Sequence, residues 1–416
     1  MRPSLHFTAR SGWINDPHGI TFRGGEYHAF FQYVPNRVSW APSCHWGHAS
    51  GPDLLSLRER AVALYPGDGD DGIWTGCLVV DDAGEARIFY TAITEPDFGI
   101  GRVRVAFPEA GLDGSWRKGD VLVTAPEDLD LIAFRDPFIR REGESWRMFV
   151  GAAGRDGTAM ALSWTSRDLE MWHYAGVVLE RSTEITEPVW MGALWECPQF
   201  IAIDGREVMI SSVWDADVLH YAGYAVGGFD GERFDADGWG RLTYGEGLYA
   251  PSLFFDADGQ PCVQFWIRGI GDHEAGWEGA HSVPYRLGRD GAVLTAEPHP
   301  DVAAHRGPCA VDGRVEGLAA DVVWSDADGS LTFASGGGTI ATVERRTGEA
   351  AVRVGDREWT VPASGPLRVI VDGPVLELSS PAGVFTAALT PAPLTPAGGD
   401  LRIEASAGAC EVYPLS

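Results

Sequence analysis

The sequence predicts an all-β protein in which a five-bladed β-propeller is followed by a C-terminal β-sandwich. A hairpin-like pattern returns about every 60 residues over roughly the first 300 residues. A second pattern, in which apolar and polar residues alternate, occupies the last hundred or so residues. The 53 Gly, 26 Pro and 16 Trp in 416 residues favour short strands joined by many turns.

Four segments share the hairpin pattern. Each contains a proline, an apolar strand, a polar turn and a second apolar strand. Proline at the first position of a strand removes no essential hydrogen bond from the sheet, so its repeated place marks where each hairpin begins. The segments are DPHGITFRGGEYHAFFQ from Asp16, DPFIRREGESWRMFVGAA from Asp136, CPQFIAIDGREVMISSV from Cys197 and APSLFFDADGQPCVQFWI from Ala250.

The spacing of these prolines predicts a fifth hairpin. Pro17 and Pro137 are 120 residues apart, whereas the later gaps are 61 and 53 residues. The long gap contains TGCLVVDDAGEARIFYTA from Thr75, which has the same layout with Gly76 in place of proline. Five hairpins, each followed by further strand-like stretches, predict five four-stranded blades around an axis. Evenly spaced hairpins in a sandwich or an open sheet are the alternative.

The pattern changes near residue 300. AEPHPDVAAHRGP reads as a linker, and beyond it LTFASGGGTIATVERRTGEAAVRV, LRVIVDGPVLELSS and GVFTAALT alternate apolar with polar residues. We therefore expect a propeller over residues 1–295, a linker over 296–310 and a sandwich over 311–416.

Composition restricts the partners. With 59 acidic and 32 basic residues, the net charge of -27 argues against nucleic acid and anionic membranes and favours a neutral substrate. The N-terminal residues lack a basic and apolar leader, and no apolar run reaches the roughly 18 residues of a membrane span, so we expect a cytoplasmic protein. Six scattered cysteines without C-x-x-C spacing predict reduced thiols. We expect no metal and no cofactor, and the sequence makes no prediction about oligomeric state.

Three acidic residues stand at one point of the repeat. Asp16 and Asp136 directly precede the repeated proline, and Glu196 lies two residues before Pro198. In a propeller the first strand of each blade lines the axis, so these carboxyl groups should face one another. Convergent carboxylates push pKa values apart, which glycoside hydrolysis requires: one group stays ionised and another holds a proton. The plainer interpretation is that each acid caps a turn before proline.

These residues lie in motifs of a known family. WINDP at residues 13–17, FRDP at 134–137 and WECP at 195–198 resemble the W-x-N-D-P, F-R-D-P and E-C-P motifs of invertase, levanase and fructan hydrolases, which form glycoside hydrolase family 32. The connecting stretches FQY at 31–33, WAP at 40–42, HWGH at 45–48 and ALYP at 63–66 resemble that family too. The likeness extends to LRVIVDGPVLELSS in the C-terminal part.

The resemblance implies a retaining β-fructosidase. Asp16 would attack the anomeric carbon of the fructosyl unit, and Glu196 would act as general acid and then as general base. Asp136 would hold fructose hydroxyls and stabilise the transition state. Arg135 would form charge-assisted bonds near Glu196 or the sugar. The residues expected to bind substrate are Asn15, Gln32, Trp40, Trp74, Thr75, Arg135 and Trp266.

Departures from the family pattern widen the range of substrates that we expect. Thr243 and Gly247 stand where relatives usually carry acids, which weakens the case for sucrose as donor. The expected substrates are therefore fructan-type oligosaccharides, difructose compounds or sucrose. Fructosyl transfer through the same intermediate, an inverting arabinanase or xylosidase, and a propeller that binds sugar without cleaving it stay open. A kelch-like or WD-like scaffold would need repeats of about 40 to 50 residues, which the sequence does not show.

Overall fold

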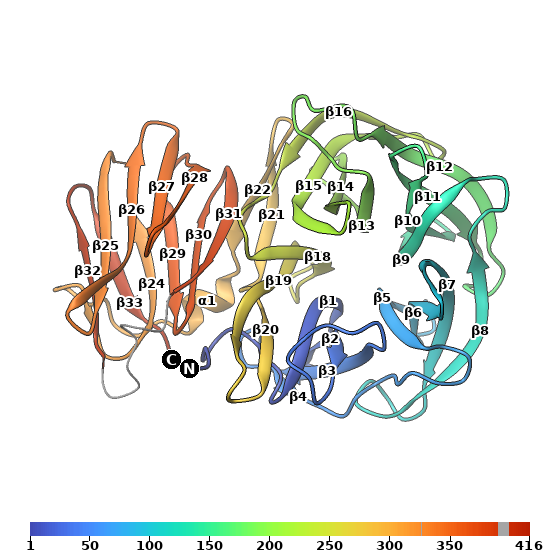
Figure 1. The fold of residues 1–416 in the computed structure, drawn as a ribbon, viewed down its shortest axis with the longest axis horizontal. Helices are drawn as coiled ribbons and strands as arrows, with labels where there is room; N and C mark the ends of the chain where they lie inside the picture. Colours follow the sequence, from blue (N-terminus) through green and yellow to red (C-terminus); the bar gives the residue numbers. More distant parts are fainter. Residues whose placement is uncertain (326, 390–398) are drawn as a thin grey trace.

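The computed structural model describes residues 1–325, 327–389 and 399–416. Over these residues the protein forms 33 strands and one five-residue helix, so the all-β prediction is confirmed. No helix in the described ranges is long and apolar enough to cross a membrane. Figure 1 shows two parts side by side: residues 12–298 surround a central region, and residues 314–325, 327–389 and 399–414 form a smaller part beside it.

The larger part consists mainly of antiparallel strands that follow one another in the chain. Its first half contains β1 (Gly12–Arg23), β2 (Glu26–Val34), β3 (His45–Gly51), β4 (Arg58–Glu59), β5 (Gly72–Val80), β6 (Ala86–Thr94), β7 (Asp97–Pro108), β8 (Trp116–Thr124), β9 (Leu131–Glu142), β10 (Ser145–Gly154), β11 (Thr158–Ser166) and β12 (His173–Ser182). Its second half contains β13 (Leu194–Ile203), β14 (Arg206–Asp215), β15 (Val218–Phe229), β16 (Phe234–Arg241), β17 (Thr243–Gly245), β18 (Leu248–Phe255), β19 (Pro261–Asp272), β20 (Trp277–His281), β21 (Tyr285–Asp290) and β22 (Val293–Pro298).

All five predicted hairpins are present as antiparallel pairs. They are β1–β2, β5–β6, β9–β10, β13–β14 and β18–β19. The turn of the first hairpin uses Gly24 and Gly25, whose φ angles are 64° and 90°. Two successive positive φ angles are typical of the tight turn that matches the twist of paired strands, and glycine reaches them without strain.

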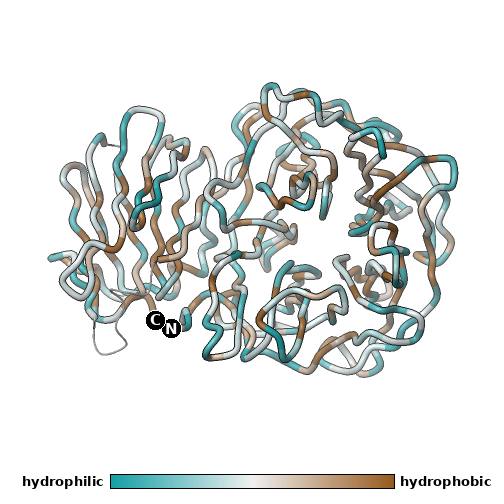
Figure 2. Tube along the Cα trace, viewed as in Figure 1, coloured by the Kyte–Doolittle hydropathy of each residue, from teal (hydrophilic) through white to brown (hydrophobic). Residues whose placement is uncertain are grey.

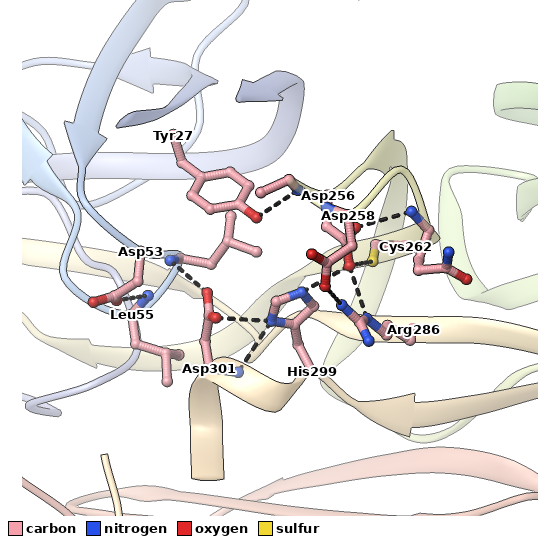
Figure 3. Close-up of polar contacts among 12 residues, drawn as sticks. Tyr27, Asp53, Leu55, Asp256, Asp258, Cys262, Arg286, His299 and Asp301 are labelled. Carbon is pink, nitrogen blue, oxygen red and sulfur yellow. Dashed lines mark hydrogen bonds and ion pairs between the residues drawn. The ribbon is translucent and has the colours of Figure 1, made fainter. Parts of the chain in front are cut away.

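The beginning of the chain lies against the last strands of the larger part. β1 pairs in parallel with β20 through Gly12 and Trp277, so β1–β4 and β18–β22 share one nine-stranded sheet. A polar cluster that joins other segments of these two groups of strands is drawn in Figure 3. There, His299 lies between the carboxylates of Asp256 and Asp301, at 3.1 and 3.3 Å, and Asp301 accepts a bond from the backbone N–H of Leu54. This cluster therefore connects the segment after β22, at the end of the larger part, to the β3–β4 connection near its beginning.

The segment expected as a linker, 296–310, contains the end of β22 and the helix α1 (Pro300–Ala304). The strands of the smaller part are β23 (Arg314–Val315), β24 (Ala319–Trp324), β25 (Gly329–Ser335), β26 (Gly338–Arg346), β27 (Glu349–Val354), β28 (Arg357–Pro362), β29 (Leu367–Asp372), β30 (Val375–Ser380), β31 (Gly383–Ala388), β32 (Leu401–Ala405) and β33 (Cys410–Pro414). With β17 they make two six-stranded sheets. Buried side chains of both sheets, such as Trp324 and Phe333, share one hydrophobic core. In Figure 2 apolar segments follow the strands of both parts.

A buried ionic cluster joins the N-terminal segment to the smaller part. The imidazole of His6 lies 2.9 Å from Asp372 and 3.1 Å from Glu377, which also accepts a hydrogen bond from the hydroxyl of Tyr285. Burial by itself would lower the pKa of His6, but bonds and charges from both acids raise it to about 9. The pKa of Asp372 falls to about 2, because the bonds and charge of His6 outweigh the effect of burial. This cluster is therefore charged at neutral pH.

We expect the stability contributed by His6 to be lost at alkaline pH. The folded-state pKa of about 9 exceeds the ordinary value of 6.5, so the contribution is complete below pH 6.5 and disappears as the pH rises through 9. A shift of this size corresponds to roughly 3 kcal/mol. In urea unfolding, His6→Phe should be destabilised most at pH 6, and the difference from the wild type should shrink by pH 9.5. His273→Gln, at an exposed histidine, is the control. A constant difference across this range would contradict the assignment.

Candidate active site

The five hairpins share an irregularity at the same place. In the first strand of each, the register with the second strand shifts beside the repeated proline or its equivalent. A β-bulge of this kind bends the strand and redirects side chains, which is why bulges are frequent near active sites. The displaced residues are 15 and 16 in β1, 75 in β5, 136 and 137 in β9, 197 and 198 in β13, and 250 and 251 in β18.

Three of the bulged residues have left-handed backbone conformations. Asp136, Cys197 and Ala250 each precede the repeated proline, with φ angles of 66°, 50° and 48°. Non-glycine residues rarely adopt this conformation, which costs of the order of 1 kcal/mol or more at each position. Repeating such strain at three equivalent positions indicates that these bulges aim side chains rather than merely end strand pairing.

The bulges deliver the three predicted carboxylates to one cavity of about 620 Å³. Nine of the ten residues predicted for the site line this cavity. They are Asn15, Asp16, Gln32, Trp40, Trp74, Arg135, Asp136, Glu196 and Trp266. The tenth, Thr75, lies behind the wall, where its hydroxyl donates a 2.6 Å hydrogen bond to Asp16. Thr243, whose identity had weakened the case for sucrose, is buried in β17 against β31 and is outside the set of described residues that line the cavity.

Asp16 is held by hydrogen-bond donors on both oxygens. Asn15 donates to Oδ1 at 3.0 Å, while Gln32 at 3.2 Å and Thr75 at 2.6 Å donate to Oδ2. Burial raises the pKa of Asp16, the bond from Thr75 opposes this rise, and the charge of Glu196 adds to it. The donors orient the carboxylate and favour its ionised form, as a nucleophile requires.

Removing the Thr75 hydroxyl should move the pH dependence of activity. Because the hydrogen bond from Thr75 lowers the pKa of Asp16, we expect Thr75→Val to raise that pKa. The acidic limb of the kcat/KM profile should then shift to higher pH. The decrease in kcat/KM at the pH optimum should be smaller than the decrease on the acidic limb. Profiles on one substrate that the wild type cleaves test this, and Thr332→Val, in β25 of the smaller part, is the matched control. An acidic limb that stays in place would contradict the role given to Thr75.

Asp136 is the most buried of the three acids, with 5% of its surface exposed. The backbone N–H of Cys197 donates to its Oδ2 at 2.9 Å, and the Cys197 thiol lies 3.7 Å from this oxygen and 3.8 Å from Asp16 Oδ2. Burial raises the pKa of Asp136 to about 7, with Arg135 opposing the rise and Glu196 reinforcing it. The sulfur of Cys197 thus lies within 4 Å of an oxygen of each carboxylate, so Asp16 and Asp136 are close neighbours.

Glu196 is bound at each oxygen by a different partner. Arg135 donates to Oε1 from Nε at 3.1 Å and from Nη2 at 2.8 Å, and the hydroxyl of Tyr249 donates to Oε2 at 2.5 Å. Burial and the charge of Glu196 raise the pKa of Tyr249 well above its ordinary value, so Tyr249 keeps its proton and acts as donor. The two partners set the orientation of this carboxyl group.

Aromatic side chains form much of the remaining wall. The rings of Trp13 and Trp266 meet edge to face, with their centroids 5.5 Å apart. The indole N–H of Trp13 donates a hydrogen bond of 3.0 Å to Asn15 Oδ1. Trp40 contacts Trp74 edge to face at 5.8 Å, and 45% of the Trp40 surface is exposed. Such rings offer apolar faces to sugars while hydrogen bonds fix their own orientation.

Sequence reasoning missed several residues of the site. Tyr249 stands two residues before Pro251, as Glu196 stands two before Pro198, so the repeat register was a signal that could have found it. Trp13 lies inside a recognised motif but was not selected. The other missed lining residues have no such signal, because hairpin ends and connections bring them to the cavity: Phe98, Gly99, Ile132, Ala133, Trp214, Asp217 and Leu219.

Two groups of potential metal ligands lie elsewhere in the described structure. His28 and His48 approach within 3.2 Å, with Asp113 beside them. The second group is the cluster in Figure 3, where Asp256 accepts from Arg286 at 2.7 Å. The guanidinium of Arg286 already neutralises the carboxylate that a cation would need there.

Comparison with known proteins agrees with these motifs. The family model for the glycosyl hydrolases family 32 N-terminal domain matches residues 6–298. The chain belongs to glycosyl hydrolase family 32. A sucrose-6-phosphate hydrolase from Zymomonas mobilis is 31% identical over 308 residues, covering 68% of this chain and 59% of that protein. A levanase from Bacillus subtilis is 30% identical over 322 residues, covering 71% of this chain and 44% of the levanase.

The chain therefore matches less than two thirds of the length of these family 32 relatives. Solved structures match it more completely. A family 32 β-fructofuranosidase from Bombyx mori superimposes with a TM-score of 0.85 at 23% identity, covering 100% of this chain and 94% of that one. Fructan 1-exohydrolase IIa from Cichorium intybus gives a TM-score of 0.78 at 19% identity. These likenesses establish a shared fold.

Proposed function

We propose that this family 32 chain is a retaining β-fructofuranosidase. The observation that carries the proposal is that Asp16, Asp136 and Glu196, from three different hairpins, line one cavity. Burying three mutually repelling acids together costs stability, and a purely structural site gains nothing from it. Glycoside hydrolysis needs two carboxyl groups in different protonation states, which such a site provides.

The proposed architecture is a five-bladed propeller over residues 1–295, a linker over 296–310 and a β-sandwich over 311–416. Five bulged hairpins arranged around one cavity support the propeller. Two six-stranded sheets with a common core support the sandwich. The likeness to family 32 structures over the whole chain supports both.

The proposed reaction has two steps. In the first, Asp16 forms a bond to the fructosyl anomeric carbon while the glycosidic bond breaks and Glu196 gives its proton to the leaving oxygen. In the second, Glu196 takes a proton from water, which attacks the same carbon and releases Asp16. Asp136 binds hydroxyl groups of the fructosyl unit through hydrogen bonds. Retention requires about 5 to 5.5 Å between the Asp16 and Glu196 carboxyl groups.

The other predicted residues divide into two roles. Asn15, Gln32 and Thr75 position Asp16, as their hydrogen bonds indicate. Trp40, Trp74 and Trp266 supply apolar surface for sugar rings, and Arg135 holds Glu196. The proposed substrates are fructan-type oligosaccharides, difructose compounds and sucrose. Fructosyl transfer uses the same intermediate with a sugar in place of water.

Methanol as acceptor tests the mechanism. With inulin, levan or sucrose as donor, a covalent intermediate should yield methyl β-fructofuranoside with the anomeric configuration of the donor, detected by NMR. An inverting enzyme, which needs about 6.5 to 9.5 Å between its carboxyl groups, would not form this product. If no fructose or reducing sugar were released from any of the three donors, the protein would be a sugar-binding member of the fold.

A further inference from the structure

The cavity has a buried base and an exposed mouth. Asn15, Asp136 and Trp266 are each 5% exposed and form the base. Trp40 and Ile132 are 45% and 39% exposed and lie at the mouth with Asp217. If the proposed nucleophile holds the fructosyl unit at the base, the mouth receives the leaving-group sugar.

Asp217 is placed at the mouth by a tight turn between β14 and β15. The φ angles of Ala216 and Asp217 are 48° and 62°, both in the left-handed region. Non-glycine residues rarely occupy this region in succession, so the surrounding hairpin must hold the turn in place. The backbone that carries Asp217 therefore has a defined position where the leaving group would enter.

The cavity contains far more negative than positive charge. Four carboxylates line it, three at the proposed catalytic positions and one at Asp217. Among the described lining residues Arg135 is the single arginine or lysine, and its guanidinium is already bonded to Glu196. The guanidinium of Arg268 lies behind the wall, where it donates to the backbone carbonyls of Leu219 and His220 at 2.7 and 3.2 Å. No lining cation among the described residues is left to receive an anionic group.

We infer that the leaving-group end of this cavity selects uncharged sugars and rejects phosphate esters. This inference rests on the proposed function and narrows its substrate class. A phosphate on the leaving sugar would meet Asp217 and the catalytic acids without a counter-charge, and like charges brought together weaken binding strongly. Trp40 and Ile132 instead offer apolar surface that suits the face of a neutral sugar ring. Family membership does not make this distinction, since relatives include sucrose-6-phosphate hydrolases.

The test compares sucrose with sucrose 6-phosphate, whose phosphate is on the leaving glucosyl unit. For the full chain, kcat/KM for the phosphate ester should be lower by at least about tenfold. This ratio should narrow as ionic strength rises, because salt screens the repulsion. Both compounds are also assayed as inhibitors of inulin hydrolysis, where the ester should bind at least about tenfold more weakly. An ester used as well as sucrose, or a ratio independent of salt, would overturn the inference.

Variants of Asp217 test whether its negative charge causes the discrimination against the phosphate ester. Asp217→Lys should bring the two kcat/KM values closer together by about tenfold, and Asp217→Asn by less. Asp356→Lys makes the same charge reversal in the β27–β28 turn of the other part of the molecule and should leave the ratio unchanged (Figure 1). If Asp217→Lys left the ratio unchanged, the inference would fail. Failure to release fructose from sucrose, inulin and levan would instead overturn the proposed function.

Discussion

Replacing Asp16 with asparagine is expected to lower kcat/KM by about 10⁴-fold or more, as loss of a covalent nucleophile does in other enzymes. The amide has nearly the shape of the carboxylate but cannot attack the anomeric carbon. Asn15, Gln32 and Thr75 surround the side chain with donors, so the substitution changes its chemistry without creating space. Initial rates of fructose release from inulin, levan and sucrose measure the loss.

Stability separates this effect from misfolding. Burial and the charge of Glu196 raise the pKa of Asp16, so the ionised carboxylate is a cost to folding. Its removal offsets the hydrogen bond lost where the amide nitrogen faces a donor, so the midpoint of thermal unfolding should change little. Asp235→Asn, at an exposed position in β16, makes the same chemical change away from the cavity and should keep full activity. Substantial activity in Asp16→Asn would show that another group is the nucleophile.

Glu196→Gln is expected to lower kcat/KM for sucrose or inulin by about 10² to 10⁴-fold, the usual contribution of a general acid. The loss should depend on the leaving group. β-Fructofuranosyl fluoride releases fluoride without needing a proton, so its first step should proceed in the variant. Because Glu196 is also the proposed base for the second step, a burst of fluoride close to one equivalent of enzyme should precede slow turnover.

Two further measurements on Glu196→Gln test the role of Glu196: turnover in the presence of azide, and thermal stability. Azide attacks without a general base, so it should speed turnover of the fluoride in Glu196→Gln and yield a β-fructosyl azide. Thermal stability should fall, because the substitution leaves the buried Arg135 guanidinium without its carboxylate partner. Glu232→Gln, in an exposed turn, is the control. A loss on the fluoride as large as the loss on sucrose, without a burst or azide rescue, would leave Glu196 only a positioning role.

The sequence anticipated much of the site because the repeat carries positional information. The expectation that the repeated proline takes the first position of its strand is wrong: in four of the five hairpins it lies inside the first strand, at or beside the bulge, where the ladder does not need its N–H. The proline still marked the bulge, and Asp16, Asp136 and Glu196 were identified from that place. The same register applied to Tyr249 would have identified the residue that donates to Glu196. Phe98 and Asp217 could not be found in this way, because the beginning of β7 and the β14–β15 turn, which lie outside the repeated part of the hairpins, bring them to the cavity.

Local chemistry along the chain determined the strands, the hairpin turns and the acids beside the repeated prolines. These depend on alternation, turn residues and proline, which act between neighbouring residues. Only the tertiary structure decided that the acids share one cavity, that Arg135 and Tyr249 hold opposite oxygens of Glu196, and that Thr75 supports Asp16 from behind. Such contacts join residues about 50 to 60 positions apart, and the twist and packing of whole sheets set their distances.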